Sequence, residues 1–585
     1  MVFSVRAPEL CRQCRERHAA AATAAAARRA RAPAASAHTR SSNASAGAGA
    51  EPPSPGESAL ERALDSLGAF GLYQRYAVAL WCLPGVLAAM YSLNYVFVAD
   101  VVPFRCLVPE CERDGPSELA PALLPPEACA RYRPLNHSLA SCLRGDYHET
   151  DTIPCTAFLY DNQDTTFAEF DLGCREWMRT LVGSVRNSAL PVALLLTGYL
   201  SDSYGRRTAF CLFGACAGAL GLVKAFSYNY TMYVTMEWFE AALGYGFNSA
   251  AYVMVVELAR PSLRTAFAAA TGVAYGVGGV LLALASRRVA YWRHLLLAAH
   301  APALLLPLYW LLGDESARWL HARGHRHRAE AVIRKAARWN KVTLDESLMS
   351  EVATENVSGE KKPEGNPWLA LLRSRVLLAR FGVCCWCWVA TAFVYYGLTI
   401  NSVTLAGDKH VNFALNMAME VVASLFLVMV LERCGRKWSI FAAFLVCGVV
   451  CVTPFFVSHA GTGLGLFMVG KLTITFAFNA LYVFTAELFP TATRSSALAA
   501  CSLVGRLGSV LAPQTPLLLS NKYIQALLYG VCSLLAALAL LATPETRRAR
   551  LPAAVAAAER LRAPPPAPAP APPPPPAQRV LTADT

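Results

Sequence analysis

The sequence predicts an all-α membrane protein of twelve membrane-spanning helices arranged in two halves. Of its 585 residues, 55% are hydrophobic and only 16% carry a charge, whereas soluble domains carry about 25% charged residues. Long apolar runs recur along the whole chain, and several charged residues of the first half return in the second at a fixed offset. Hydropathy and internal repetition therefore point to a duplicated helical bundle in a lipid bilayer.

Twelve apolar runs are long enough to cross a bilayer, for which a helix needs about 20 residues. A representative run is LLLAAHAPALLLPLYWLL, residues 295–312. The runs begin near Gln74, Trp177, Arg207, Thr231, Thr265, Trp292, Val376, Val411, Trp438, Thr462, Ser495 and Tyr523.

The net charge of +13 is distributed in a way that indicates topology rather than nucleic-acid binding. Arg and Lys are concentrated in residues 1–50 and 321–380, whereas acidic residues are in excess between about 101 and 176. Loops rich in Arg and Lys remain in the cytoplasm. We therefore expect both termini and the middle loop to be cytoplasmic, the segment 101–176 to be extracellular, and no nucleic-acid partner.

The chain is expected to divide into five parts. In chain order these are a disordered cytoplasmic tail (1–63), a first six-helix half (64–313) that includes the extracellular loop 101–176, a cytoplasmic central loop (314–375), a second six-helix half (376–546) and a disordered Pro-rich cytoplasmic tail (547–585). The stretch Ala563–Ala577 is prone to the polyproline conformation, which is either a stiff tail or a ligand for an SH3-type partner.

The expected outer loop contains an even number of cysteines, which in an oxidising compartment predicts three disulfides with fifteen alternative connectivities. A zinc site is the competing interpretation, but the spacings contain no CxxC pair. The loop also holds the glycosylation sequence Asn136-His137-Ser138. The cysteines are Cys106, Cys111, Cys129, Cys142, Cys155 and Cys174.

Charged residues at the expected cytoplasmic ends of the helices repeat at an offset of 230 residues, so the six-span unit is duplicated. The pairs are Asp202 with Glu432, Glu257 with Glu487, Arg264 with Arg494 and Glu315 with Glu545. Two such halves describe the major facilitator architecture, in which the substrate lies between the halves near the midplane. We predict that ion pairs among these residues hold an inner gate closed; the alternative is that the charged turns only anchor the topology. The predicted gating residues are Asp202, Arg206, Arg207, Glu257, Arg264, Glu315, Arg318, Glu432, Arg436, Glu487, Arg494 and Glu545.

Several motifs resemble those of the organic ion transporters of solute carrier family 22: LGAFGLYQRY, FDLGCREW, GYLSDSYGRR, DESARWL, AELFPTATR and TPETRRARLP. The second half is most similar to the organic cation/carnitine branch, through GDKHVNFALNMAMEVV and GKLTITFAFNALYVFTAELFPTATR. The resemblance implies a transporter at the plasma membrane that works by alternating access. It implies no cofactor, apart from a coupling ion that could be sodium or a proton.

The resemblance also implies a substrate site. Arg506 occupies a position where anion and carnitine carriers have Arg, and Glu420 matches an acid of cation and carnitine carriers. Lys471 matches a basic position of the branch, and Tyr395 and Tyr396 match an aromatic wall suited to an ammonium group. Ionisable residues inside a span are costly and by default functional. The alternative is that Arg506 and Glu420 pair with each other, or with Glu237, and only tie helices together.

One residue departs from the family pattern. Glu237, in EWFEAALGYG, stands where the family has a basic residue, and it could be a proton site, a cation ligand or a partner of Arg506. The expected function is transport of small organic zwitterions or cations, carnitine-like. The alternatives are an organic anion exchanger and a non-transporting cell-surface receptor. No nucleotide loop, metal-ligand cluster or nucleophile–base arrangement supports an enzyme.

Overall fold

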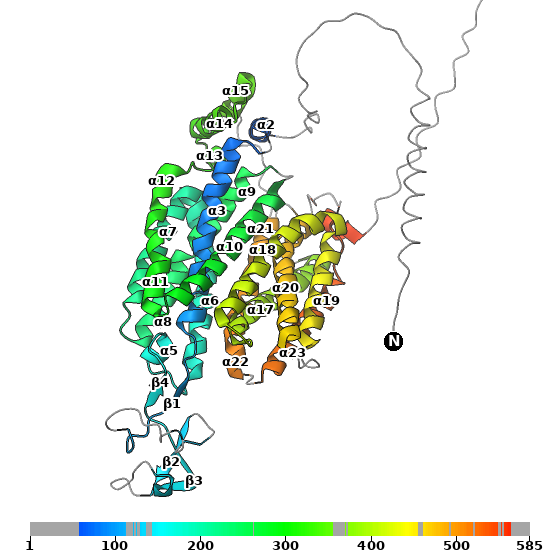
Figure 1. The fold of residues 1–585 in the computed structure, drawn as a ribbon. Helices are drawn as coiled ribbons and strands as arrows, with labels where there is room; N and C mark the ends of the chain where they lie inside the picture. Colours follow the sequence, from blue (N-terminus) through cyan, green and yellow to red (C-terminus); the bar gives the residue numbers. More distant parts are fainter. Residues whose placement is uncertain are drawn as a thin grey trace, which may run out of the picture. The chain divides into compact units, whose positions relative to one another are not determined.

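The computed structural model describes residues 58–562, apart from gaps at 69, 113–120, 122–123, 126–128, 136–142, 261–262, 355–368, 370–372, 454–459, 491–492, 519–520, 548–551 and 553–554. The described chain is almost entirely helical (Figure 1). We call residues 72–312 the N-terminal bundle and residues 375–540 the C-terminal bundle.

The N-terminal bundle carries the first set of long helices. Its elements are α3 (Leu72–Leu93), α4 (Tyr95–Val98), α6 (Glu176–Tyr204), α7 (Arg206–Ala225), α8 (Tyr230–Gly244), α9 (Gly246–Leu258), α10 (Arg264–Arg288), α11 (Trp292–His300), η4 (Ala301–Leu308) and α12 (Tyr309–Leu312).

The C-terminal bundle follows the same plan. Its elements are α17 (Arg375–Asn401), η5 (Ser402–Thr404), α18 (Lys409–Cys434), α19 (Arg436–Val452), α20 (Ala460–Leu488), α21 (Arg494–Leu511), η7 (Ala512–Gln514), α22 (Thr515–Leu518) and α23 (Lys522–Leu540).

Ten helical segments of the described chain are long and apolar enough to cross a membrane. The expected fourth span is present as α8 and α9, two helices that meet at Tyr245, and it carries the buried acids Glu237 and Glu240. The expected ninth span is α19, a helix of 17 residues. Both segments are helical where the sequence predicted spans, so the structure is compatible with twelve.

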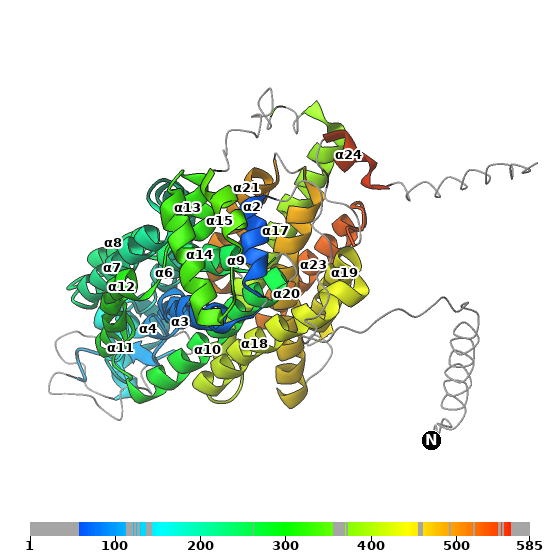
Figure 2. The ribbon, with the colours of Figure 1, turned by 90° about the horizontal axis from the view of Figure 1, so that it is seen from above.

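Each bundle has its own hydrophobic core. One cluster of buried side chains lies wholly between Leu377 and Ala558, and a second lies wholly between Ala77 and Tyr309. The two bundles meet chiefly along α10 and α18, whose contact is the most extensive between any two helices (Figure 2). Glycines of α10 allow this close approach, since a Cβ at Gly279 would lie 2.5 Å from the Met417 side chain.

The helices α2 (Ala59–Ser66), α13 (Ala317–Ala322), α14 (Arg326–Asn340) and α15 (Glu346–Thr354) form a group beside one end of the N-terminal bundle (Figures 1 and 2). The prediction that residues 1–63 are disordered is wrong for the last five of them. Ser58 caps α2 by accepting the N–H of Glu61, and Leu60 and Ala63 pack in one core with Ile333 of α14.

The same correction applies after the C-terminal bundle. A short helix α24 (Val555–Glu559) and the 3₁₀ turn η8 (Arg560–Arg562) lie in the segment predicted to be disordered. Arg380 of α17 donates to the carbonyl of Ala558, and Ser374 donates to the Glu559 carboxylate, so the bundle holds this helix.

The expected outer loop contains two short antiparallel sheets of two strands each. Strand β1 (Phe104–Cys106) pairs with β4 (Phe158–Tyr160), and β2 (Ala130–Pro134) pairs with β3 (Tyr147–Pro154). A one-turn helix, α5 (Thr166–Glu169), leads on to α6. Disulfides join Cys106 to Cys155 and Cys129 to Cys174, and Cys111 is also disulfide-bonded. Cys142 and Asn136 lie outside the described residues.

Candidate functional site

The turn between α6 and α7 is built around a carboxylate that caps the start of α7. Gly205 has φ +103°, and a Cβ there would lie 2.4 Å from Oε2 of Glu315. The backbone N–H groups of Arg206 and Arg207 donate to Glu315 at 3.0 and 3.1 Å. The first N–H groups of a helix have no partner within it and carry partial positive charge. Glu315, 109 residues further on, therefore fixes the end of α7 to the segment after α12.

The side chain of Arg206 binds two further acids. We call Asp202, Arg206, Arg207, Glu257 and Glu315 the first gate network. The Arg206 guanidinium donates to Glu257 of α9 at 2.9 Å, to Asp202 at 2.9 Å and to the carbonyl of Ser201. Arg207 donates to the carbonyls of Trp310 and Gly313. Burial raises the pKa of the Glu315 carboxyl, although its bonds from backbone N–H groups act in the opposite direction.

The turn between α18 and α19 repeats this arrangement. Gly435 has φ +92°, and a Cβ there would lie 2.8 Å from Oε2 of Glu545. The N–H of Arg436 donates to Glu545 at 2.9 Å, and the Arg436 side chain pairs with Glu487 of α20 at 3.2 Å. Lys437 donates to two carbonyls after α23, whereas Arg207 donates to one carbonyl within α12 and to one directly after it. We call this set the second gate network.

The remaining predicted gating residues are placed less uniformly. Arg318 pairs with Glu61 of α2 at 3.0 Å and lies within electrostatic range of Arg264. Arg494 lies within electrostatic range of Glu487. The side chain of Glu432 lies outside what the structure describes. Two of the six predicted acids, Glu315 and Glu545, thus accept hydrogen bonds from backbone N–H groups at the first turn of a helix.

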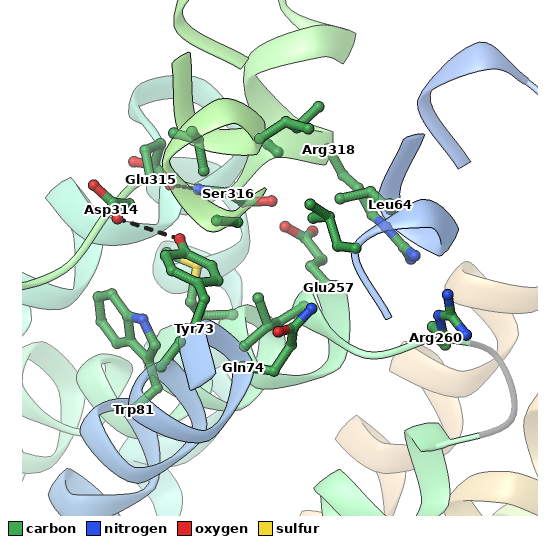
Figure 3. A pocket seen from close by; sticks show the side chains of 18 of the residues that line it. Leu64, Tyr73, Gln74, Trp81, Glu257, Arg260, Asp314, Glu315, Ser316 and Arg318 are labelled. Carbon is green, nitrogen blue, oxygen red and sulfur yellow. Dashed lines mark hydrogen bonds between the residues drawn. The ribbon is translucent and has the colours of Figure 1, made fainter. Parts of the chain in front are cut away.

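A cavity beside the first gate network lies under α2 (Figure 3). It is lined by Tyr73, Trp81, Glu257, Glu315 and Arg318 among others, and the Tyr73 hydroxyl donates to Asp314 at 3.2 Å. Its volume is about 50 Å³. This is room for water, whose share of liquid volume is about 30 Å³, and not for an organic ion.

In the C-terminal bundle, Glu420 lies in a buried polar cluster of α17, α18 and α20. Lys471 of α20 pairs with Glu420 at 3.3 Å, and the Tyr395 hydroxyl donates to the same carboxylate at 3.0 Å. The Lys471 ammonium lies 3.4 Å from the centroid of the Tyr395 ring and donates to Thr399 at 2.9 Å. The ion-pair partner of Glu420 in the described chain is thus Lys471 and neither Arg506 nor Glu237. We call these four residues the C-terminal cluster.

Arg506 of α21 is buried, with 7% of its surface exposed, and its Nε has no hydrogen-bond partner among the described residues. The guanidinium lies within electrostatic range of the phenols of Tyr245, Tyr396 and Tyr482. These phenols come from the α8–α9 junction, α17 and α20, so both bundles contribute to the surroundings of Arg506. No ion pair of Arg506 with an acid is found in the described part of the chain.

Glu237 does not meet Arg506. It pairs with Arg186 of α6 at 2.6 Å and with Lys224 of α7 at 2.8 Å, and both cations also pair with Glu240. Arg186, Lys224 and Glu240 are not among the residues predicted from the sequence, because each lies inside a run of mostly apolar residues. The signal that could have found them is the rule that an ionisable residue inside a span needs a named partner.

The bundles are joined by polar contacts near the helix ends next to the two-stranded sheets. Ser184 of α6 donates to the carbonyl of Val510 at 2.8 Å, and Gln514 donates to Ser184 at 2.7 Å. Lys409 pairs with Asp100 at 2.6 Å. The two gate networks, in contrast, each connect residues of one bundle and its flanking segment.

Comparisons with known proteins agree with this architecture. A family model described as "Sugar (and other) transporter" matches residues 156–552. The chain is 31% identical over 514 residues to the organic cation transporter protein of Drosophila melanogaster, covering 83% of this chain and 92% of the relative. It is 30% identical to solute carrier family 22 member 7 and 29% identical to organic cation/carnitine transporter 2, both of Rattus norvegicus; these matches cover 86% and 83% of this chain and 98% and 91% of the relatives.

Among solved structures, the proton:xylose symporter XylE bound to 6-bromo-6-deoxy-D-glucose has a TM-score of 0.57 at 16% identity, covering 84% of this chain and 98% of that one. This likeness shows the fold. The chain is therefore a transporter of the major facilitator superfamily. Within that superfamily it belongs to solute carrier family 22. The predicted fold class and family are confirmed, the protein is not an enzyme, and a transporter of this kind needs no cofactor.

Proposed function

We propose that this chain carries small organic ions bearing a carboxylate, foremost carnitine-like zwitterions, across the plasma membrane by alternating access. The observation that supports this most is Arg506, a buried guanidinium with an unpartnered Nε at a position that both bundles reach. A guanidinium offers a planar fork of donors that matches a carboxylate. The named activities of the relatives, organic cation and organic cation/carnitine transport, favour the same class of substrate.

Tyr396 and the C-terminal cluster supply the complementary part of the proposed site. Tyr396 lies within electrostatic range of Arg506 and packs against Tyr395, with ring centroids 5.2 Å apart. The phenol faces of such a pair suit a quaternary ammonium group. Glu420 is already paired with Lys471, so an incoming ammonium would have to compete with that lysine for the carboxylate.

This pairing gives weight to a second candidate, an organic anion exchanger. Because Lys471 neutralises Glu420, Arg506 is the unpaired charge of the site, and an anion would need nothing more. Glu237 is removed from the proposed substrate site, since Arg186 and Lys224 already bind it.

The two gate networks support alternating access. Each fixes the first turn of one helix to the end of its own bundle, so each bundle can move as one body while contacts between bundles change. We propose that this end faces the cytoplasm, because the basic segments and both tails belong to it by the positive-inside rule. The proposed halves are 64–313 and 376–546, joined by a cytoplasmic segment 314–375, with an extracellular loop 101–176. A Pro-rich tail within 547–585 would be available to an SH3-type partner.

The test is uptake into cells that express the chain, using labelled carnitine, tetraethylammonium and an organic anion such as p-aminohippurate. We expect carnitine uptake that falls at least tenfold in Arg506→Ala and less in Arg506→Lys, which keeps the charge but loses the fork. Glu420→Ala should reduce uptake of carnitine more than that of the anion. Anion uptake that needs Arg506 and is indifferent to Glu420 would favour the exchanger. The absence of any uptake at normal surface levels would overturn the proposal.

A further inference from the structure

The N-terminal bundle contains a buried charge network that the substrate site does not use. It consists of Arg186, Lys224, Glu237, Glu240 and His300, from α6, α7, α8 and α11, and none is more than 3% exposed. We call it the N-terminal network. Each of the two cations pairs with both acids, at 2.5–3.1 Å. With a neutral His300 the charges balance, two positive against two negative.

His300 is the member whose bonding is incomplete. Its Nδ1 lies 2.9 Å from the carbonyl of Leu296. A carbonyl can only accept, so Nδ1 carries a hydrogen and donates it. In the neutral ring, Nε2 then holds only a lone pair. Nε2 is fully buried, has no hydrogen-bond partner among the described residues, and lies 3.9 Å from Oε1 of Glu240. Nε2 of the neutral ring and Oε1 of Glu240 are therefore two acceptors that face each other. A single proton on Nε2 would turn this pair into a donor and an acceptor.

The ring is held in this position by a close backbone and an aromatic face. Tyr91 of α3 stacks on the imidazole, with centroids 4.7 Å apart and planes 12° apart. On the α7 side, a Cβ at Gly221 would lie 1.9 Å from Cδ2 of His300, so only glycine leaves room for the ring. Interiors leave few unpaired polar atoms. Packing alone therefore does not explain why Nε2 of His300 lies without a partner beside the Glu240 carboxylate.

We propose that Nε2 of His300 and the carboxylate of Glu240 hold one exchangeable proton, and that this proton is the coupling ion of transport. Proton binding forms one N–H bond at Nε2 and turns the facing pair into an imidazolium–carboxylate ion pair. Release returns the proton to solvent and restores the neutral ring. The proton site stands on the geometry of the N-terminal network, whereas its coupling role rests on the proposed function.

Charged or titratable side chains surround His300 from several helices. Tyr91 faces it from α3, Lys224 from α7, and Glu240 from α8 with Glu237 behind. Arg186 of α6 reaches Glu240 from the other side. A bound proton gives this otherwise balanced set a net charge of +1. Charges interact strongly in a buried, low-dielectric site.

Electrostatic interactions connect this network to the surroundings of Arg506. Tyr95 of α4 lies within electrostatic range of Arg186, Glu237 and Tyr396. Tyr396 in turn lies within electrostatic range of Arg506 and of Arg186. An added positive charge in the N-terminal network therefore favours a carboxylate bound at Arg506 and opposes a simple cation. This sign predicts that protons and carboxylate-bearing substrates move together.

The first test needs no substrate. The purified full-length chain, with ring-labelled histidine, is studied by isotope-edited infrared difference spectroscopy between a neutral and an acidic sample. We expect an imidazole-to-imidazolium signal that is lost in His300→Gln and also in Glu240→Gln, which keeps the ring but not the carboxylate. His410→Gln, a control for a histidine of the other bundle, should keep this signal.

A spectrum in which His300→Gln removes no such signal would overturn the proton site, as would an unchanged signal in Glu240→Gln. Gly221→Ala provides a variant that changes no titratable group. It moves the ring by the contact of its Cβ, and we expect the same loss of signal. Only variants that elute as the wild type on size exclusion are compared, so that a folding defect is not read as a lost proton.

The second test measures coupling in proteoliposomes that contain only the purified chain. An inwardly directed proton gradient should stimulate carnitine uptake several-fold in the wild type. In His300→Gln, uptake down a carnitine gradient should remain, but the stimulation should disappear. Stimulation that persists in His300→Gln would overturn the coupling role. A wild type that takes up no carnitine would overturn the proposed function instead, while the spectra still decide on the proton site.

Discussion

The two bundles match at their ends and differ in their interiors. At the gate networks, the helix-capping bond is 3.0 Å from Arg206 to Glu315 and 2.9 Å from Arg436 to Glu545, and both turns need a glycine with positive φ. In the interiors, five charged or titratable residues form the N-terminal network, whereas one ion pair, Glu420 with Lys471, forms the centre of the C-terminal cluster. The capped turns are therefore alike in the two bundles, whereas the buried charged residues differ.

The largest expected effect is a loss of stability when a cation is removed from the N-terminal network, which has no counterpart of the same size among the described residues of the C-terminal bundle. Arg186→Leu leaves Glu237 and Glu240 with Lys224 as their only strong cation, and breaking a buried ion pair from one side costs about 3–5 kcal/mol. We expect a large fall in the thermal unfolding temperature of the purified protein in detergent. The double variant Arg186→Leu/Glu237→Leu restores the balance of charge and should recover most of it. A double variant as unstable as the single one would mean that the charges do not act as a set.

The next effect tests the match between the gates. Gly205→Ala and Gly435→Ala each force a side chain into a left-handed backbone, at a cost of about 1–2 kcal/mol, and each presses a Cβ against a capping carboxylate. We expect similar losses of thermal stability from both. Gly198→Ala is the control, since its Cβ would meet nothing within 4 Å. A loss confined to one of the two turns would show that the gates are not equivalent.

A smaller effect is expected from the capping charges themselves. Glu315→Gln and Glu545→Gln keep an acceptor for the helix N–H groups but remove the negative charge. A charge at a helix N-terminus is worth roughly 0.3–1 kcal/mol, or up to about 2 when partly buried. Both variants should fold, with unfolding temperatures a few degrees lower. Transport should also slow in both, and a normal rate in either would argue against a role of that cap in gating.

The smallest expected effect is a pH dependence of stability that arises from Glu169, near the start of α6. We describe no equivalent of this carboxylate in the C-terminal bundle. Glu169 of α5 accepts from Arg293 and from the indole of Trp292. Burial alone would raise the pKa of this carboxyl, but the bonds from Arg293 and Trp292 outweigh it and hold the pKa below its ordinary value. Its contribution to stability is therefore present above the pKa of an unfolded glutamate and is lost as the pH falls through the lower folded value.

We accordingly expect the thermal stability of the wild type to fall on acidification below about pH 4, in the region of the ordinary glutamate pKa. Glu169→Gln should lose part of that pH dependence and be slightly less stable at neutral pH. Asp161→Asn is the control at the same end of the molecule. An acid profile that is the same in wild type and Glu169→Gln would show that this carboxylate is not the group responsible.

The residues of the gate networks could be predicted from the sequence because they recur. The 230-residue offset predicts Glu257 and Glu315, and the GYLSDSYGRR motif predicts Arg206. The N-terminal network could not be derived in the same way. Arg186 and Lys224 each look like an isolated charge in an apolar run, and only packing of α6 and α7 against α8 shows that they neutralise Glu237 and Glu240.

The segment before α3 shows that amino-acid composition alone does not predict order reliably. The residues before Leu64 lack a strong apolar pattern, so disorder was predicted up to residue 63, yet Leu60 and Ala63 are enough to dock α2 on α14. A short helix needs only a few buried side chains when a preformed surface receives it. For Arg506, in contrast, burial within a span was foreseeable, but the phenols around it come from three separate elements and required the fold.

We propose above all that Arg506 makes this chain a carrier of carboxylate-bearing organic ions. The decisive measurement is the initial rate of labelled carnitine uptake by proteoliposomes that contain only the purified chain, with wild type, Arg506→Lys and Arg506→Ala compared at equal reconstitution. We expect saturable uptake by the wild type, a reduced rate in Arg506→Lys and a rate near that of empty liposomes in Arg506→Ala. Uptake by Arg506→Ala at the wild-type rate would show that Arg506 does not bind the substrate.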